Sequence, residues 1–255
     1  MLGLYDKIIT LIKARKTAKI TDPTEEEIKF TEIYDNHSWA GGEETRSGSG
    51  STLNSTQNTV PLLQKFISDY RIRTLVDVGC GDGLWILKII PLLKRYQGHD
   101  VVAELIEKNK IRAKERGLRG VSYSVLNPVH ETPKKADAIL FRDVAIHLPN
   151  ELIIKSFSNF VASGSKYLIT TNFPNEPETS KFYERLNGQV RIGKYRRVDY
   201  SKEPFLLPDP IFRIQDNEIN PDGLMAGKHK NRELAVYRLD QIKDRVKELL
   251  DSLDG

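Results

Sequence analysis

Three glycines alternate with other residues directly after an apolar segment in RTLVDVGCGDGLWILKII, residues 73–90. Gly79 and Gly81 permit backbone conformations and close contacts that a Cβ would block, so this turn is able to approach a ligand. Asp77 precedes the first glycine by two residues and brings negative charge to the same place. A phosphate would be repelled there and a cation attracted. The pattern therefore predicts a ligand site that favours positive charge.

The spacing of the glycines separates the nucleotide ligands that such a turn can bind. A dinucleotide fingerprint places its third glycine where this chain has Leu84, and a P-loop needs Gly-Lys-Ser/Thr after four spacer residues, a run that this sequence lacks. Both phosphate-binding interpretations are weakened. S-adenosylmethionine, which carries a sulfonium and an ammonium group, suits Asp77 better.

Two further polar residues are spaced for an adenosine ligand. Asp100 follows Gly79 by 21 positions, near the spacing at which an acid accepts hydrogen bonds from ribose hydroxyls. Adenosine is common to NAD and S-adenosylmethionine, so this acid supports both. Asn127 ends the third predicted strand, where its side chain can accept from the adenine amino group. Each also has a structural interpretation, Asp100 as a helix N-cap and Asn127 as a turn residue.

An alternation of strands and helices must position these residues. Strands separated by helix-length segments indicate right-handed βαβ units and an α/β fold with a doubly wound, mostly parallel sheet. Two later strands, in PIFRIQDN and RELAVYRL, make the sheet seven-stranded, and DQIKDRVKELLDSL closes the chain as a helix. The earlier predicted strands are 74–78, 96–100, 120–126, 137–142 and 166–171, and the predicted helices are 60–71, 83–95, 101–117 and 149–161.

The amino-terminal part predicts a helical extension followed by a lid. Residues 1–19 have the pattern of an amphipathic helix, which packs on the domain or a partner, or lies with its basic side on an anionic membrane. A second helix begins at TDPTEEEIKFTEIYDN, capped by Thr21 or Asp22 with Pro23 at its first position. A Gly/Ser-rich segment follows. We expect residues 1–56 to form these helices and the lid, and residues 57–255 to form the ligand-binding domain.

The composition narrows the class of protein. The chain has 255 residues, 39% of them hydrophobic, and no apolar run approaches the roughly 20 residues that span a bilayer. A single cysteine, Cys80, rules out an internal disulfide, and with no secretory signal we expect a cytoplasmic location. A net charge of +4 is mild for a nucleic-acid binder, so nucleic acid is not an expected partner. The five histidines lack the spacing of a zinc site and no metal ligands are predicted, but magnesium assistance to the acceptor hydroxyl, using Asp143 and its neighbours, stays an open alternative.

Three segments, LVDVGCGDG, YQGHDVV and ADAILFRDVAIHL, resemble the consecutive motifs of class I S-adenosylmethionine-dependent methyltransferases over about residues 55–175. More narrowly, SGSGST, GCGDGLWI, RDVAIHL, YLITTNFPN and RRVDYSKEPFLLPDP are similar to a branch in viral and bacterial glycan synthesis that methylates sugar hydroxyls. Asn127 stands where this family usually has Asp. The resemblance implies a Rossmann-like methyltransferase fold, S-adenosylhomocysteine as product, and a cofactor site that includes Asp77, Gly79, Cys80, Gly81, Asp100, Val101, Asn127 and Arg142.

Methyl transfer to a hydroxyl needs in-line positioning and a base for the hydroxyl proton. The base should lie at the carboxyl end of the fourth strand, where the sequence has Asp143 and, four residues on, His147. Asp143 is the first candidate and His147 the second, and Asp143 orienting His147 is a third arrangement. The structural alternatives are a helix cap for Asp143 and a core position for His147.

The lid and the acceptor pocket have weaker signals. Trp39, Arg46 and Ser49 are candidates to close over the methionine end of the donor, with Arg46 pairing its carboxylate, or to belong to a solvated loop. Trp85 is expected to pack on the sheet. A later group is expected either to stack on a sugar ring or to be ordinary surface residues: Tyr183, Tyr195, Arg196, Arg197 and Tyr200.

The leading hypothesis is an O-methyltransferase that uses S-adenosylmethionine on a sugar hydroxyl of a glycan or polysaccharide precursor. One alternative is a methyltransferase that acts on another small molecule or on RNA. The other is a catalytically silent protein that binds the cofactor and partners a glycosyltransferase.

Overall fold

A computed structural model describes residues 22–39, 45–175, 186–216 and 231–253 of the chain. Within these residues seven strands form one sheet in the order β3-β2-β1-β4-β5-β7-β6. The parallel strands are β1 (Thr74–Val78), β2 (Arg95–Asp100), β3 (Val121–Val125), β4 (Ala138–Phe141) and β5 (Tyr167–Asn172). The last two are β6 (Phe212–Gln215) and β7 (Glu233–Arg238), and β7 runs antiparallel to both of its neighbours. The predicted mostly parallel, seven-stranded sheet is confirmed.

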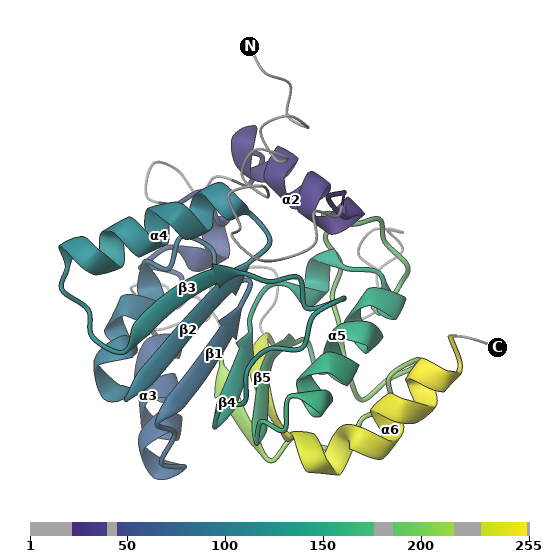
Figure 1. Ribbon diagram of the computed structural model, residues 1–255. Helices are drawn as coiled ribbons and strands as arrows, with labels where there is room; N and C mark the ends of the chain where they lie inside the picture. The colour runs from purple at the N-terminus through teal and green to yellow at the C-terminus, as the bar shows by residue number, and fades with distance from the viewer. Residues whose placement is uncertain (1–21, 40–44, 176–185, 217–230, 254–255) are drawn as a thin grey trace.

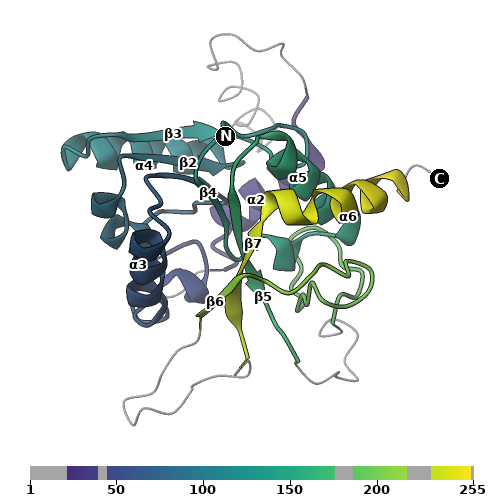
Figure 2. The same ribbon diagram turned by 90° about the horizontal axis from the view of Figure 1, so that it is seen from below.

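Helices cover both faces of the sheet, as a parallel sheet requires. Successive side chains of a strand point to opposite faces, so Val76 packs in one apolar core and Leu75 in the other. The first core lies under α5 (Asn150–Ala162) and α6 (Leu239–Asp251). On the other face, seen on the opposite side in Figure 2, are α3 (Thr59–Asp69) and α4 (Ala103–Glu115).

Helix α2 (Glu25–Asp35) lies across the carboxyl edge of the sheet (Figure 1). Its N-cap is Thr24, so the prediction of Thr21 or Asp22 as the cap was wrong by two or three residues. The reason is a capping box: Thr24 Oγ1 accepts from the Glu27 backbone at 3.3 Å, and Glu27 Oε2 accepts from the Thr24 backbone at 2.9 Å. The box fixes the helix start beside Asn127, whose Nδ2 donates to Thr24 Oγ1 at 3.0 Å.

The predicted helix over 83–95 was wrong. The segment forms two short 3₁₀ turns, Trp85–Lys88 and Ile90–Leu92. Pro91 explains the break, because proline has no backbone N–H and its ring clashes with the preceding helical turn. The other predicted strands and helices agree with the structure to within one or two residues at most ends.

The predicted helix in residues 1–19, and with it the predicted membrane contact of residues 1–20, lies outside the described residues. Among the helices that the structure does describe, none combines the length and the apolar character that a membrane crossing needs.

Candidate functional site

The glycine turn after β1 carries the backbone into the edge of the sheet. Gly79 and Gly81 have φ angles of +74° and +56°, a region that favours glycine. The N–H groups of Gly79 and Cys80 both donate to the His99 carbonyl at the end of β2, at 2.8 and 2.9 Å. A Cβ on Gly79 would collide with Val144, which follows β4. The turn is therefore held close against the neighbouring strand ends.

Two carboxylates flank this turn. Asp77, on β1, is 4% exposed, and its Oδ2 accepts a 2.7 Å hydrogen bond from the Tyr96 hydroxyl. Burial raises the pKa of Asp77 to about 7, and the charge of Asp100 also acts to raise it. Asp100, at the end of β2, accepts from the Gly81 N–H at 3.1 Å and from the Val102 N–H at 3.0 Å. Burial raises the pKa of Asp100 as well.

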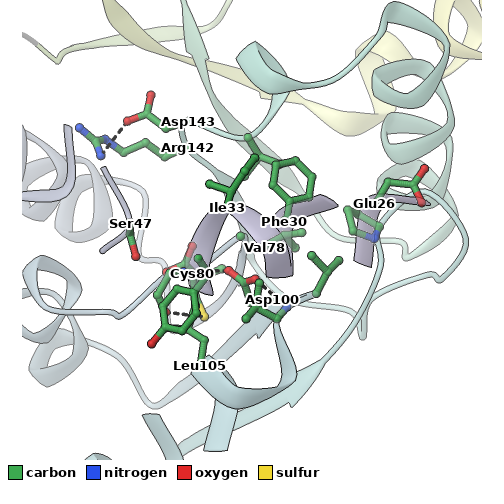
Figure 3. Close-up of a pocket in the computed structure, with 18 of the residues that line it drawn as sticks. Glu26, Phe30, Ile33, Ser47, Val78, Cys80, Asp100, Leu105, Arg142 and Asp143 are labelled. Carbon is green, nitrogen blue, oxygen red and sulfur yellow. Dashed lines mark hydrogen bonds and ion pairs between the residues drawn. The ribbon is translucent and has the colours of Figure 1, made fainter. Parts of the chain in front are cut away.

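A cavity with about 1020 Å³ of empty space, its open mouth included, lies between this turn and α2. Figure 3 shows Arg142 and Asp143 at one end of it and Asp100 and Leu105 at another, with Phe30 of α2 in view between them. Most of the site residues predicted from the sequence line this cavity: Asp77, Gly79, Cys80, Gly81, Asp100, Val101, Asn127, Arg142, Asp143 and Arg46. Ser49 and His147 are not among its lining residues.

Asp143 belongs to a buried ionic cluster with Arg142, Asp216 and Arg232. Arg232 Nη2 lies 2.7 Å from Asp143 Oδ2 and 2.8 Å from Asp216 Oδ2, and Arg142 Nη2 lies 3.0 Å from Asp216 Oδ1. Burial alone raises the pKa of Asp143, but the two guanidiniums outweigh it and lower the pKa to about 2. Asp143 is therefore ionised at neutral pH and is a weak base.

The same cluster fixes the end of β4 to distant parts of the chain. Thr59, at the start of α3, donates a 2.6 Å hydrogen bond to Asp216, which follows β6. The Arg142 guanidinium donates to the Gly50 carbonyl at 2.9 Å and lies 5.2 Å from the centroid of the Trp85 ring. Trp85 is buried, as predicted, but it also lines the cavity. The role of the cluster is to hold the wall that contains Asp143.

His147 lies behind the cavity wall. Its ring stacks on the indole of Trp39 with centroids 4.2 Å apart, and Tyr195 lies 6.3 Å from it on another side. Burial lowers the pKa of His147 to about 4, so its imidazole is neutral at pH 7. Trp39 itself lines the cavity, so His147 supports a lining residue.

Residues 45–51 cover the glycine turn and form its roof. The Asp82 carboxylate accepts from the Thr45 hydroxyl and from the Arg46 N–H, and the Asp82 N–H donates to Ser47 Oγ at 2.8 Å. Arg46 lines the cavity, with its guanidinium 5.7 Å from the centroid of the Tyr34 ring. Ser49 instead begins a 3₁₀ turn, and its carbonyl accepts from Ser55 Oγ at 2.7 Å. Ser47 and Ser51, rather than Ser49, line the cavity.

Sequence reasoning missed two groups of site residues. Asp216 and Arg232 flank residues 217–230, far along the chain from Asp143, and only the fold brings them together. Helix α2 forms one wall of the cavity. Its TEEE capping pattern predicts a helix start but does not predict a ligand site. Its lining residues are Glu26, Phe30, Ile33 and Tyr34.

Three residues of the proposed sugar-binding group are not at a surface. Arg196 and Tyr200 are fully buried and Arg197 is 2% exposed, and none of the three lines the cavity, so both interpretations, sugar stacking and ordinary surface residues, were wrong for them. Tyr200 packs in the core against Phe157, with ring centroids 5.3 Å apart. Burial lowers the pKa of Arg196 to about 10. Tyr183 lies outside the described residues.

No protein-family model matches the sequence, and no curated protein matches it either. Solved structures match in fold. The N-methyltransferase NodS from Bradyrhizobium japonicum WM9, in complex with S-adenosyl-L-homocysteine, matches with a TM-score of 0.56 and 14% identity over 81% of this chain and 97% of NodS. The methyltransferase domain of bacterial CtHen1 matches with a TM-score of 0.50 and 16% identity over 72% of this chain and 100% of that domain. These likenesses show the Rossmann-like fold of methyltransferases of known structure.

Proposed function

We propose that the chain is an S-adenosylmethionine-dependent methyltransferase whose acceptor is a hydroxyl group of a sugar or glycan precursor. The observation that carries the proposal is the pair of acids, Asp77 and Asp100, in one cavity at the carboxyl edge of the sheet. In open α/β sheets ligands bind at this edge. A buried carboxylate whose described hydrogen-bond partner is a neutral phenol favours a cationic ligand.

The residues of the cavity fit the parts of the proposed donor. Asp100 accepts from the backbone N–H groups of Gly81, Val102 and Val101, and the lone pair that this leaves on its carboxylate can accept from a ribose hydroxyl. Asp77 is placed for the positive charge of the methionine part, and Arg46 for its carboxylate. Apolar residues form walls for the base: Val101, Leu105, Leu126 and Val129.

The bound donor supplies a methyl group on a positively charged sulfur, which is a good leaving group. Asp143 lines the cavity and is ionised, so it can accept a hydrogen bond from the acceptor hydroxyl and orient its oxygen. As the carbon–oxygen bond forms and the carbon–sulfur bond breaks, the acceptor oxygen becomes strongly acidic. A carboxylate with a pKa of about 2 is then basic enough to take the proton.

The sugar acceptor is supported by the aromatic residue at the cavity wall together with the sequence resemblance. Trp39 lines the cavity, and His147 and Phe30 contact its indole at centroid distances of 4.2 and 5.8 Å. A flat apolar ring held in place by neighbours offers a surface against which the C–H groups of a sugar ring can pack.

Calorimetry with S-adenosylmethionine and S-adenosylhomocysteine tests the donor, with NAD and ATP as competitors. We expect both compounds to bind and Asp77→Asn to bind them at least tenfold more weakly, whereas Asp69→Asn, on the solvent side of α3, binds as the parent does. An assay of S-adenosylhomocysteine release across glycans, RNA and small acceptors tests the reaction. Release with RNA alone would reject the sugar acceptor, and binding without release on any acceptor would favour a silent binding protein.

A further inference from the structure

Helix α2 holds the side-chain amide of Asn127 in one orientation. The Asn127 Nδ2 group donates to Thr24 Oγ1 at 3.0 Å and to Glu26 Oε2 at 3.2 Å. On the other side of the amide, Asn127 Oδ1 accepts from the Val129 N–H at 3.1 Å. An ionised carboxylate only accepts and a backbone N–H only donates, so these partners fix which end of the amide faces which way. The flipped amide would lose the contacts with Glu26 and Val129.

This orientation decides what Asn127 can offer a ligand. Both hydrogens of its amide nitrogen are used by Thr24 and Glu26, so no donor remains. Its oxygen has two lone pairs, of which Val129 uses one. Asn127 lines the cavity, so it presents an acceptor there and nothing else. In this setting the asparagine behaves as an aspartate would, without the negative charge.

Asn127 and Asp100 line the same cavity. In the complex with the proposed donor, a ribose on Asp100 would leave the base to extend toward the end of β3 and the residues after it. The cavity there is lined by Val102, Leu105, Leu126 and Asn127. Glu26 also lines the cavity beside Asn127, and its Oε2 accepts from Asn127 Nδ2, so Asn127 Oδ1 is the acceptor that we assign to the edge of the base.

We propose that Glu26, together with Thr24, is a positioning residue that makes the site select a 6-amino purine over a 6-oxo purine. The inference rests on the proposed function, because it assumes a donor that carries adenosine. An exocyclic amino group donates to Asn127 Oδ1, whereas a 6-oxo group brings a second acceptor against it. If the amide were free to turn, its nitrogen would face a 6-oxo group equally well and the preference would fall.

The size of the effect follows from the cost of an unmet buried polar group. Two acceptors facing each other in a buried site cost about 1–3 kcal/mol, which corresponds to roughly 5- to 150-fold in affinity. We therefore expect the parent protein to bind S-adenosylhomocysteine at least fivefold more tightly than S-inosylhomocysteine, its 6-oxo analogue.

The test is the ratio of these two affinities, measured by calorimetry for the full chain and its variants. Glu26→Ala should lower the ratio about twofold or more, because one amide hydrogen then lacks its acceptor while the Val129 N–H still opposes the flipped amide. Glu25→Ala is the matched control, since Glu25 is exposed in the same helical turn and is not a lining residue, and it should leave the ratio unchanged. Glu26→Met, which keeps the volume of the side chain, serves if the alanine variant unfolds, and it should lower the ratio equally.

A double variant separates orientation from a general structural effect. An aspartate at position 127 is an acceptor at both oxygens and needs no orienting partner. Asn127→Asp combined with Glu26→Ala should therefore restore the parental ratio, which a merely structural role of Glu26 would not do.

Each outcome decides between the two proposals. If the parent binds S-adenosylhomocysteine with the expected preference and Glu26→Ala keeps that preference, or if the double variant fails to restore it, the role of Glu26 is rejected and the proposed function stands. If the parent binds neither compound, both proposals are rejected.

Discussion

The hydroxyl of Tyr96 donates a 2.7 Å hydrogen bond to the carboxylate of Asp77, across the boundary between strands β2 and β1. Within the described residues no lysine or arginine forms an ion pair with Asp77. Burial raises its pKa to about 7, against the hydrogen bond from Tyr96 and the more weakly acting charge of Arg142, both of which lower it. Binding of a cation, stability and pH are linked through this one group.

Donor binding should weaken as the pH falls. A cationic donor binds the ionised form of Asp77, whose pKa in the free protein is about 7. The affinity for S-adenosylmethionine should therefore be roughly tenfold lower at pH 6 than at pH 7.5. Calorimetry at both pH values measures this, and Asp77→Asn should show no such slope. Equal affinity of the parent at the two pH values would show that Asp77 does not face the donor.

The same carboxylate should make the free protein less stable as the pH rises. The folded pKa of Asp77 lies above its unfolded value, so the folded state binds the proton more tightly and the free energy of unfolding falls between about pH 4 and pH 7. One pKa unit corresponds to about 1.4 kcal/mol. Asp77→Asn should thus be more stable than the parent at pH 8, by a few kcal/mol, and similar to it at pH 4. Urea unfolding at the two pH values provides the check.

Asp143 and His147 should differ in their effect on turnover. Asp143 lines the cavity and His147 does not, so Asp143→Asn should lower kcat about 10²-fold or more and His147→Asn by much less. At saturating substrates kcat should stay constant from pH 5.5 to 8, because the pKa values of about 2 and about 4 lie below that range. A larger loss for His147→Asn would reverse the ranking of the two bases.

Arg232 should be essential for stability. Its guanidinium pairs with Asp143 and Asp216 inside the ionic cluster, and Asp216 is fully buried on its side chain. Arg232→Met leaves two carboxylates with Arg142 alone, which should lower the free energy of unfolding by about 3–5 kcal/mol. Lys65→Met is the control: its side chain is 66% exposed and its ion pair with Asp69 is on the surface, so its effect should be below about 1 kcal/mol.

Gly81→Ala should displace the roof from the glycine turn. The added Cβ would lie 2.5 Å from Ser47 Oγ, at a φ of +56°. We expect at least tenfold weaker binding of S-adenosylhomocysteine, with a partial recovery when Ser47→Gly removes the colliding atoms. If the double variant binds no better than Gly81→Ala alone, backbone strain at position 81 is the cause rather than the roof.

The strands and the glycine turn could be predicted because their signals are local. Val76 and Val78 alternate with Leu75 and Asp77 in one short segment, and the turn follows immediately. Asp216 could not be predicted in this way, since it meets Arg142 across 74 positions of sequence. The predicted helix over 83–95 did not take Pro91 into account, although a proline inside a helical pattern is a signal in the sequence that the helix breaks. The capping box of Thr24 and Glu27 was also readable, and it places the helix start correctly.

Because α2 forms a wall of the cavity, it also sets the smallest fragment of this chain that can bind the ligand. A boundary after residue 56 keeps every described strand, yet it discards a side of the cavity and the partners that orient Asn127. A fragment that starts at position 57 should keep its sheet by circular dichroism and still fail to retain nucleosides. The amino-terminal extension is thus part of the ligand-binding site. A fragment without it would fold but would not recognise the ligand.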